Sequence, residues 1–373
     1  MNAQPLVLVL GTADWNAPVA TNQHHVTAAL AAAGPVLFVE GAGTRSLRPA
    51  DAARVLRRLR ARPSLAGRPV PAGVQVVSPR IVPHHTARTR RVNSALLHRQ
   101  VRRWAQHPGP RLLWTYTPFT YGLEHVADRT VYHLVDLLHE NPGVDRGRLL
   151  AAERGLRADL AIATSPAVEE HLRLQGFTPT RCLPNVCDVA LFSAAAAAGD
   201  VPRETSAVFA GTLAPHKLDG DLLLDLARVL GDRLRLVGPL VEPADPLWRR
   251  LTAAGAQVVG PLAPAALARE LASASVGLVP YRISPLTRGI SPLKTYEYLA
   301  AGLPVVSTPL PAVAPLDGAV FVRDRAAFVA QVRELVDQDD PTRPARMTQL
   351  AQGHDWDSRG RELRALAGAL LAA

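Results

Sequence analysis

Short apolar runs alternate with helical patterns along the whole chain. The runs are rich in Val, Leu and Ile, and between them apolar positions recur three or four residues apart. This alternation predicts parallel α/β architecture. We expect strands at 5–10, 35–40, 74–78, 111–116, 130–135, 159–164, 181–185, 206–211, 233–238, 256–260, 275–280, 304–308 and 319–324.

A low-complexity stretch, SAAAAAGDVPRET, interrupts this pattern at 193–205. We expect it to link an N-terminal domain, 1–192, to a C-terminal domain, 206–354, and the length of 373 residues also suits two domains. The apolar stripe within 355–373 predicts a closing helix that packs back on the N-terminal domain. The expected fold class is α/β, with two Rossmann-like parallel-sheet domains facing each other across a cleft. Ligands of such sheets bind beyond the carboxyl ends of the strands.

The basic residues are unevenly distributed. The formal net charge is +10, and residues 45–111 hold 16 arginines against a single acid, Asp51. Such a span creates a positive field whose partner would be anionic lipid, nucleic acid or an anionic substrate, unless it is only a solvated Arg-rich surface. Two cysteines, Cys182 and Cys187, are too few for a zinc site or a disulfide framework and indicate thiols in a cytoplasmic protein.

The stretch SPLKTYEYLAAG at 291–302 has the signals of a helix that starts and stops sharply. Ser291 is a suitable N-cap, Pro292 suits the first helical position, and Gly302 suits the C′ position. Free N–H groups and the positive end of the helix dipole favour an anion at its N-terminus. One of the only two lysines of the chain, Lys294, lies in its first turn, so we expect a phosphate there.

Glu297 lies one turn after Lys294 on the same helical face. Its carboxylate could accept hydrogen bonds from a vicinal diol such as that of ribose. The alternative is a simple i,i+3 ion pair with Lys294. The residues alone leave these two interpretations open.

This stretch resembles the C-terminal signature of GT-B glycosyltransferases of group 1, P-L-K-x-x-E-Y-x-A-A-G-x-P-V-V. The segments VYHLVDLLHENPG, DLAIATSPAVEEHL and LPNVCDVALF are similar to bacterial surface-polysaccharide transferases of the xanthan glucuronosyltransferase and teichuronic acid type. The resemblance implies that the lysine contacts a nucleotide diphosphate and the glutamate binds ribose hydroxyls. The matching residues are Pro292, Leu293, Lys294, Glu297, Tyr298, Ala300, Ala301, Gly302, Pro304, Val305 and Val306.

The sequence departs from that family at one functional position. Retaining members carry a second glutamate eight positions before the ribose-binding one, where this chain has Gly289. The choice between inversion and retention therefore stays open. No cofactor is expected, and the donor site is expected to work without a metal, because cationic side chains and a helix dipole can stabilise a departing diphosphate.

The expected donor-binding residues lie in the C-terminal domain, at strand ends and along the helix at 291–302. The resemblance implies a glycine turn after the first strand of this domain, with a basic residue nearby that faces the diphosphate. Lys217 suits that basic residue, although Thr212 stands where the family usually has an arginine. The alternative is that Lys217 forms an ion pair with Asp219 or Asp221. The full donor set is Gly211, Thr212, Lys217, Tyr281, Arg282, Ser291, Leu293, Lys294 and Glu297. Tyr281 and Arg282 are expected to flank the base or a phosphate.

The expected catalytic and acceptor residues lie in the N-terminal domain. Asp136 follows the strand at 130–135 and is the candidate base that takes the acceptor proton, with His139 and Glu140 orienting or replacing it. His133 alternates within the strand and is interpreted as a core residue. The expected acceptor-binding residues are Gly11, Asp14, Trp15 and His24.

The sequence therefore predicts a cytoplasmic glycosyltransferase that uses a nucleotide-diphosphate sugar. We expect a lipid-linked acceptor, such as a polyprenyl-linked sugar, with the Arg-rich span 45–111 holding the protein on the anionic inner membrane face. The alternatives are a nucleotide-sugar epimerase or a phosphorylase on the same fold, or a binding protein that grips nucleic acid. Nucleic acid is not an expected partner, because Trp104 is the only aromatic residue among those arginines.

Overall fold

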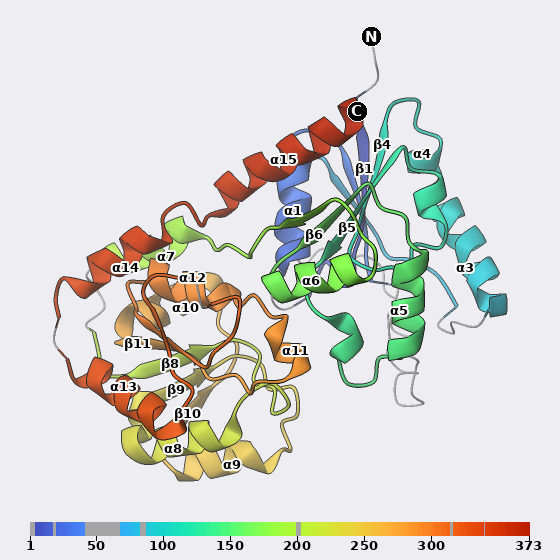
Figure 1. The fold of residues 1–373 in the computed structure, drawn as a ribbon. Helices are drawn as coiled ribbons and strands as arrows, with labels where there is room; N and C mark the ends of the chain where they lie inside the picture. Colours follow the sequence, from blue (N-terminus) through green and yellow to red (C-terminus); the bar gives the residue numbers. More distant parts are fainter. Residues whose placement is uncertain are drawn as a thin grey trace. The chain divides into compact units, whose positions relative to one another are not determined.

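The computed structural model of the chain describes residues 4–17, 20–41, 68–82, 87–198, 203–313, 316–338 and 340–373. They divide into two compact units, Met1–Leu183 with Arg359–Ala373, and Pro184–Ser358. Each unit has one parallel sheet with helices packed around it (Figure 1). The predicted α/β class with two parallel-sheet domains is thereby confirmed.

The sheet of the first unit has seven strands in the order β3-β2-β1-β4-β5-β6-β7, and all of its strand pairs are parallel. The order reverses direction between β1 and β4, which creates a topological switch point at their carboxyl ends. The strands are β1 (Leu6–Leu10), β2 (Val36–Val39), β3 (Val74–Val77), β4 (Arg111–Thr115), β5 (Arg129–Leu134), β6 (Leu160–Ala163) and β7 (Thr180–Cys182).

The C-terminal helix α15 (Trp356–Ala372) returns to the first unit from Arg359 onward, where it lies beside α1 (Asn22–Ala31) (Figure 1). Arg364 Nη1 donates to Ala29 O at 3.2 Å, and Leu363 is buried. The other helices of this unit are α3 (Ala87–Gln100), α4 (Arg102–Ala105), η2 (Leu123–His125), η3 (Leu138–Glu140), α5 (Arg146–Gly155) and α6 (Pro166–Leu174).

The sheet of the second unit repeats the strand order of the first, β10-β9-β8-β11-β12-β13, again with parallel pairs only. Its switch point lies between β8 and β11. The strands are β8 (Ala207–Ala210), β9 (Leu234–Val237), β10 (Gln257–Val259), β11 (Val276–Val279), β12 (Val305–Ser307) and β13 (Ala319–Phe321). The helices are α7 (Val189–Ala197), α8 (Gly220–Leu230), η4 (Gly231–Arg233), α9 (Pro246–Ala253), α10 (Pro264–Ser273), α11 (Pro285–Arg288), α12 (Leu293–Ala300), α13 (Arg325–Asp337) and α14 (Arg343–Ala351).

The division between the units falls at 183/184 and not at the expected linker, 193–205. Helix α7 occupies the first part of that segment, because Asp188 caps it by accepting a hydrogen bond from Leu191 N and alanine is the best helix former. Phe192 on α7 is buried in the core of the second unit. The alanine-rich composition thus encodes a packed helix over 193–197 instead of a linker.

Part of the Arg-rich span, at 45–67 and 83–86, lies outside the described residues, and so does the basic segment RPADAARVLRRLRARPSLAG. Both cysteines are free thiols, and Cys187 is buried. Among the residues that the structure describes, no helix is both long and apolar enough to cross a membrane.

Candidate functional site

The switch point of the second sheet brings together residues from three segments. Gly211 directly follows β8, and Tyr281 comes two residues after β11, so both lie at the carboxyl ends of neighbouring strands. Helix α12 supplies Lys294 to the same place. Open parallel sheets bind ligands at this position of the fold.

Lys294 is held by aromatic groups. Its Nζ donates to the Tyr281 hydroxyl at 2.7 Å and lies 5.1 Å and 5.3 Å from the ring centroids of Tyr281 and Phe209. Both distances are within the range of cation–π attraction. The side chain itself is half-buried. A cation thus stays close to the end of β8, and no ion pair links its Nζ atom to a carboxylate among the described residues.

Gly211 leaves the space that Lys294 occupies. It has a φ of +153°, and a Cβ atom there would lie 2.7 Å from Lys294 Cε and 3.0 Å from Nζ. Any larger residue at 211 would displace the lysine. The glycine expected from the sequence is therefore required by a close approach as well as by its backbone angle.

Tyr298 fixes α12 on the sheet. Its hydroxyl accepts a hydrogen bond from Ala210 N at 2.7 Å, at the last residue of β8. Its ring lies against Gly277 of β11, where a Cβ atom would come within 2.4 Å of ring carbons. The side chain of Tyr298 thereby joins α12 to β8 and β11 at the switch point, and this contact fixes the position of Lys294 relative to Gly211.

Glu297 lies one turn after Lys294 and is half-buried. Burial raises the pKa of its carboxyl group to about 7, while the positive charge of Lys294 acts in the opposite direction. The carboxyl group can therefore be neutral or ionised near neutral pH, and can either donate or accept a hydrogen bond.

The start of α12 differs from the sequence expectation. The helix begins at Leu293 with Pro292 as N-cap and no side-chain cap, so Lys294 is the second helical residue. Ser291 is used elsewhere: its Oγ accepts from Asn185 N at 3.3 Å and its carbonyl accepts from Asn185 Nδ2 at 2.8 Å. The prediction of Ser291 as N-cap is wrong, because the bonds to Asn185 take up its polar groups.

The end of α12 matches the prediction. Gly302 has a φ of +81°, its N–H donates to Leu299 O, and Leu303 N donates to Tyr298 O. This pair of bonds is the Schellman motif. It stops the helix directly before β12.

The remaining donor candidates border the switch point. Lys217 is half-buried, and its carbonyl accepts from Arg282 N at 2.9 Å, while Thr212 and Arg282 are exposed and Leu293 is half-buried. The alternative partners of Lys217 are engaged elsewhere: Asp219 caps α8 through Leu222 N, and Asp221 pairs with Arg325.

Tyr281 is only 6% exposed, and its hydroxyl is bonded to Lys294. Its ring packs edge-on against Phe209. The buried ring contacts Lys294 and Phe209, and the expectation that Tyr281 flanks the base or a phosphate stays a prediction. In this structure Tyr281 holds the ammonium group of Lys294 through its hydroxyl group and its ring.

Asp136, His139 and Glu140 follow β5 in the first unit. Asp136 is half-buried in the turn after the strand, and its carbonyl accepts from Leu138 N. His139 is buried, and its Nε2 lies 3.2 Å from Glu140 Oε1, which also pairs with Arg146. Burial is the main cause that lowers the pKa of His139. The sequence prediction that His133 is a core residue holds, since it is 2% exposed.

The acceptor candidates lie around the turn after β1. Gly11 lies against Gln23, whose Oε1 accepts from Thr12 N at 2.8 Å, and Asp14 is exposed. This turn is therefore held by a glutamine that the sequence analysis did not single out.

Trp15 and His24 are not open to an acceptor in this structure. Both are buried, and their rings pack together with centroids 5.2 Å apart. His24 Nδ1 accepts from Thr21 N at 3.0 Å, and its Nε2 lies 3.2 Å from Asp14 O. His24 therefore caps α1 in this structure, and the expectation that it binds an acceptor stays a prediction.

Sequence comparison finds a family match within the second unit. Residues 204–338 match the family model of Glycosyl transferases group 1. A curated relative, named "Putative teichuronic acid biosynthesis glycosyltransferase TuaH", of Bacillus subtilis (strain 168), is 28% identical over 169 residues, which cover 43% of this chain. The aligned part spans only 42% of that relative's length.

Solved structures share the fold over almost the whole chain. Sucrose-phosphate synthase from Thermosynechococcus elongatus has a TM-score of 0.67 at 18% identity, covering 99% of this chain and 100% of its own. Anabaena HepE in complex with UDP and glucose has a TM-score of 0.67 at 15% identity with the same coverage. These likenesses confirm the predicted GT-B fold class.

Proposed function

Because residues 204–338 match the family model of Glycosyl transferases group 1, we propose that this protein transfers a sugar from a nucleoside-diphosphate sugar to an acceptor hydroxyl group. The observation that carries this proposal is the position of Lys294 over Gly211, at the switch point between β8 and β11. The cation of Lys294 and the N-terminus of α12 at this strand end support the binding of a diphosphate there.

The diphosphate is bound by the first turn of α12 and by Lys294. To reach a phosphate oxygen, Nζ exchanges the neutral Tyr281 hydroxyl for an anion, which is the stronger hydrogen-bond partner. Lys217 and Arg282, joined through their backbones, supply further positive charge at the neighbouring loops. These groups stabilise the charge that develops on the leaving diphosphate, so no metal is needed for this step.

Glu297 accepts the two ribose hydroxyls when it is ionised. Two hydrogen bonds from a vicinal diol to one carboxylate fix the orientation of the nucleoside. Anabaena HepE has been solved with UDP-glucose, which makes UDP the first nucleotide to test.

Asp136 acts as the base. Its carboxylate takes the proton of the acceptor hydroxyl while the oxygen bonds to the sugar carbon and the bond from that carbon to the diphosphate breaks. Arg146, paired with Glu140, holds the segment that follows Asp136. The support is the position of Asp136 two residues after β5, at a carboxyl end of the first sheet.

The acceptor is a lipid-linked precursor of a cell-surface polysaccharide at the inner face of the cytoplasmic membrane. The relation to a teichuronic acid biosynthesis glycosyltransferase supports the polysaccharide class. The 16 arginines of 45–111 support binding to an anionic membrane surface, since each basic group near such a surface contributes about 1 kcal/mol to the binding free energy. Flotation with vesicles that contain anionic lipid, and not with neutral vesicles, is the expected result.

Calorimetric titration with UDP, GDP, ADP and dTDP tests the donor site. We expect one nucleotide to bind with micromolar affinity and Lys294→Ala to weaken it at least tenfold. Arg249→Ala is the matched control, because it removes an exposed cation of the same unit on α9. If the folded wild type binds none of the four nucleotides, the proposed function is wrong.

A further inference from the structure

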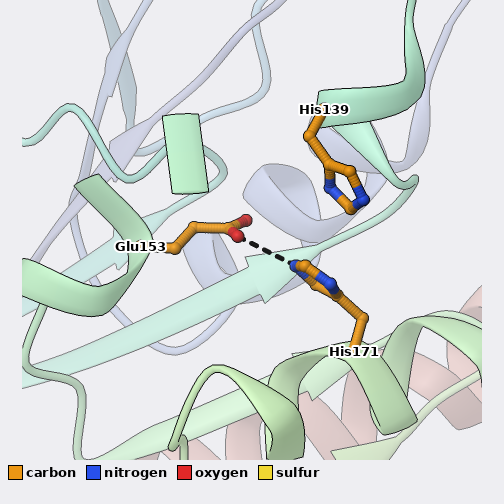
Figure 2. Close-up of side chains that lie close together, drawn as sticks. All are labelled: His139, Glu153 and His171. Atoms are coloured by element: carbon orange, nitrogen blue, oxygen red, sulfur yellow. Dashed lines mark hydrogen bonds and ion pairs between the residues drawn. The ribbon is translucent and has the colours of Figure 1, made fainter. Parts of the chain in front are cut away.

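Three side chains from different helices of the first unit lie close together. They are His139 on η3, Glu153 on α5 and His171 on α6 (Figure 2). One ligand atom from each lies within 4.8 Å of the others. No residue of the donor site takes part, and the comparisons assign nothing to this cluster.

Glu153 and His171 form the deeper half of the cluster. Glu153 is 1% exposed, and its Oε2 lies 2.8 Å from His171 Nε2, as the dashed line in Figure 2 marks. Its other oxygen accepts from the Tyr132 hydroxyl at 2.8 Å. The carboxylate is thus oriented by one hydrogen bond and directs its second oxygen toward the histidines.

His139 completes the cluster and carries the unexplained atom. Its imidazole points toward Glu153 and His171 (Figure 2), and its ring centroid lies 4.5 Å from that of His171. The Nδ1 atom is buried without a hydrogen-bond partner in the part of the chain that the structure describes. A buried polar atom without a hydrogen-bond partner lowers the free energy of unfolding. We therefore expect a ligand to bind this atom.

The surroundings match what metal ligands have around them. A ligating histidine almost always uses its second nitrogen toward a carboxylate or carbonyl, and here His139 Nε2 faces Glu140 Oε1 at 3.2 Å. Two imidazoles and one carboxylate are a common donor set for Zn²⁺ with an open fourth position.

From this convergence we propose that His139, Glu153 and His171 bind a divalent transition-metal ion of the Zn²⁺ class. Metal bonds of 2.0–2.2 Å in a tetrahedral site place ligand atoms about 3.4 Å apart. The bonded Glu153–His171 pair therefore opens slightly and His139 Nδ1 closes in, movements within the reach of side-chain rotation. The ion replaces the hydrogen-bonded proton between Glu153 and His171.

An ion there joins η3, α5 and α6. Since η3 begins two residues after Asp136, the metal fixes the segment that carries the proposed base without touching the donor site. The proposal does not rest on the proposed function, and nucleotide binding is expected to be the same with and without the ion.

The test uses the full chain freed of metal by a chelator. Competition against a chromophoric chelator measures Zn²⁺ affinity and stoichiometry, and Co²⁺ reports coordination through its visible absorption. We expect one ion per chain at micromolar affinity or tighter, with the intense Co²⁺ bands of a four-coordinate site. Binding weakens as pH falls through the imidazole range, because protons compete for the ligands.

Three variants make the test specific. His139→Gln removes the partnerless nitrogen, Glu153→Gln removes the charge, and each is expected to weaken Zn²⁺ at least tenfold. Glu140→Gln acts through His139 and weakens it about tenfold. His125→Gln is the matched control, since its side chain is 75% exposed in the same unit.

If Glu153→Gln fails to fold, as judged by circular dichroism, His139→Gln alone decides. Zn²⁺ affinity weaker than millimolar, or an affinity equal in wild type and His139→Gln, overturns the proposal. The cluster is then only a buried ion pair between Glu153 and His171.

Discussion

The Nζ atom of Lys294 lies where a side chain at Gly211 would have to be. A Cβ atom at 211 would come 2.7 Å from Lys294 Cε, and the glycine occurs at a positive φ of +153°. The sequence separates these residues widely, and Tyr298 brings them together by joining α12 to the end of β8.

Replacing Gly211 with alanine is expected to reduce nucleotide affinity at least tenfold. The added methyl group pushes Lys294 away, and a flexible side chain can yield without unfolding the protein. The backbone strain costs about 1–3 kcal/mol. Gly231→Ala is the control, because Gly231 has a φ of +57° but nothing within 4 Å. Equal nucleotide affinities of the two variants, measured by calorimetry, would contradict the role of the close approach.

The carboxyl group of Glu297 predicts a pH-dependent affinity. Burial raises its pKa from 4.5 to about 7, so below pH 7 it is protonated and above pH 7 it accepts both ribose hydroxyls. Affinity for the nucleotide sugar is expected to rise as pH increases through about 7. A nucleotide sugar has no phosphate monoester that titrates in this range, unlike a free diphosphate. Glu297→Gln should bind with a flat pH profile, and a step that persists in this variant would assign it to another group.

The same pKa shift affects stability. A carboxyl group whose pKa is higher in the folded than in the unfolded state stabilises the fold fully at a pH below its unfolded-state pKa of 4.5. This contribution is lost as the pH rises from about 4.5 through 7. Thermal unfolding of wild type and Glu297→Gln across that window should therefore diverge as pH rises, with the variant gaining relative stability. If the melting temperatures of wild type and Glu297→Gln changed in parallel with pH, the carboxyl group of Glu297 would not be desolvated in the folded protein.

Two buried tyrosines should respond differently to loss of the hydroxyl group. Tyr298→Phe leaves the buried N–H of Ala210 without an acceptor and is expected to cost about 1–3 kcal/mol of stability. Tyr281→Phe releases the half-buried Lys294, which can turn to water, and should cost less. Denaturant unfolding of both variants measures the difference. A larger loss in Tyr281→Phe would mean that Lys294 depends on that bond to remain in place.

Asp136→Asn is expected to lower the transfer rate by about 10²–10⁴-fold, the usual contribution of a general base. Nucleotide affinity should not change, since the donor residues belong to the second unit. The release of nucleoside diphosphate in the presence of acceptor measures the rate. Glu140→Gln serves as the comparison. If Glu140→Gln lowered the transfer rate to this extent while Asp136→Asn kept full activity, Glu140 would be the base.

Leu363→Ala is expected to destabilise the protein by about 2–5 kcal/mol, because Leu363 is 1% exposed and its truncation leaves a cavity beside the first unit's core. Leu366→Ala, on the same helix at a half-buried position, should cost less. A thermal melt of each variant measures the effect. Comparable melting temperatures for Leu363→Ala and wild type would show that α15 adds little to the unit.

The strands and the end of α12 could be predicted because their signals are local. Short apolar runs locate every strand to within one residue at its start, although β7 and β13 end three residues earlier than expected. Gly302 at a positive φ ends the helix as its position required. The start of α12 was mispredicted because Ser291 bonds to Asn185, a residue distant in sequence. Propensity cannot reveal such tertiary competition for a polar group.

The side chains of the first unit were less predictable for the same reason. Trp15 and His24 follow a strand, as ligand-binding residues do, yet they fill the core, since burial depends on neighbours that no local pattern identifies. The cluster of His139, Glu153 and His171 draws on three elements with no regular spacing. Only the fold brings these ligand atoms within reach of one another.

The second unit is one continuous segment, 184–358, whereas the first is completed by residues from both ends of the chain. A gene fragment for 184–358 would therefore encode every donor-site residue without interruption. A fragment that stops before 359 would deprive the first unit of the helix against which α1 packs. The two halves are thus unequal as building blocks: the second unit lies on one uninterrupted stretch of chain, and the first needs residues from both sides of that stretch.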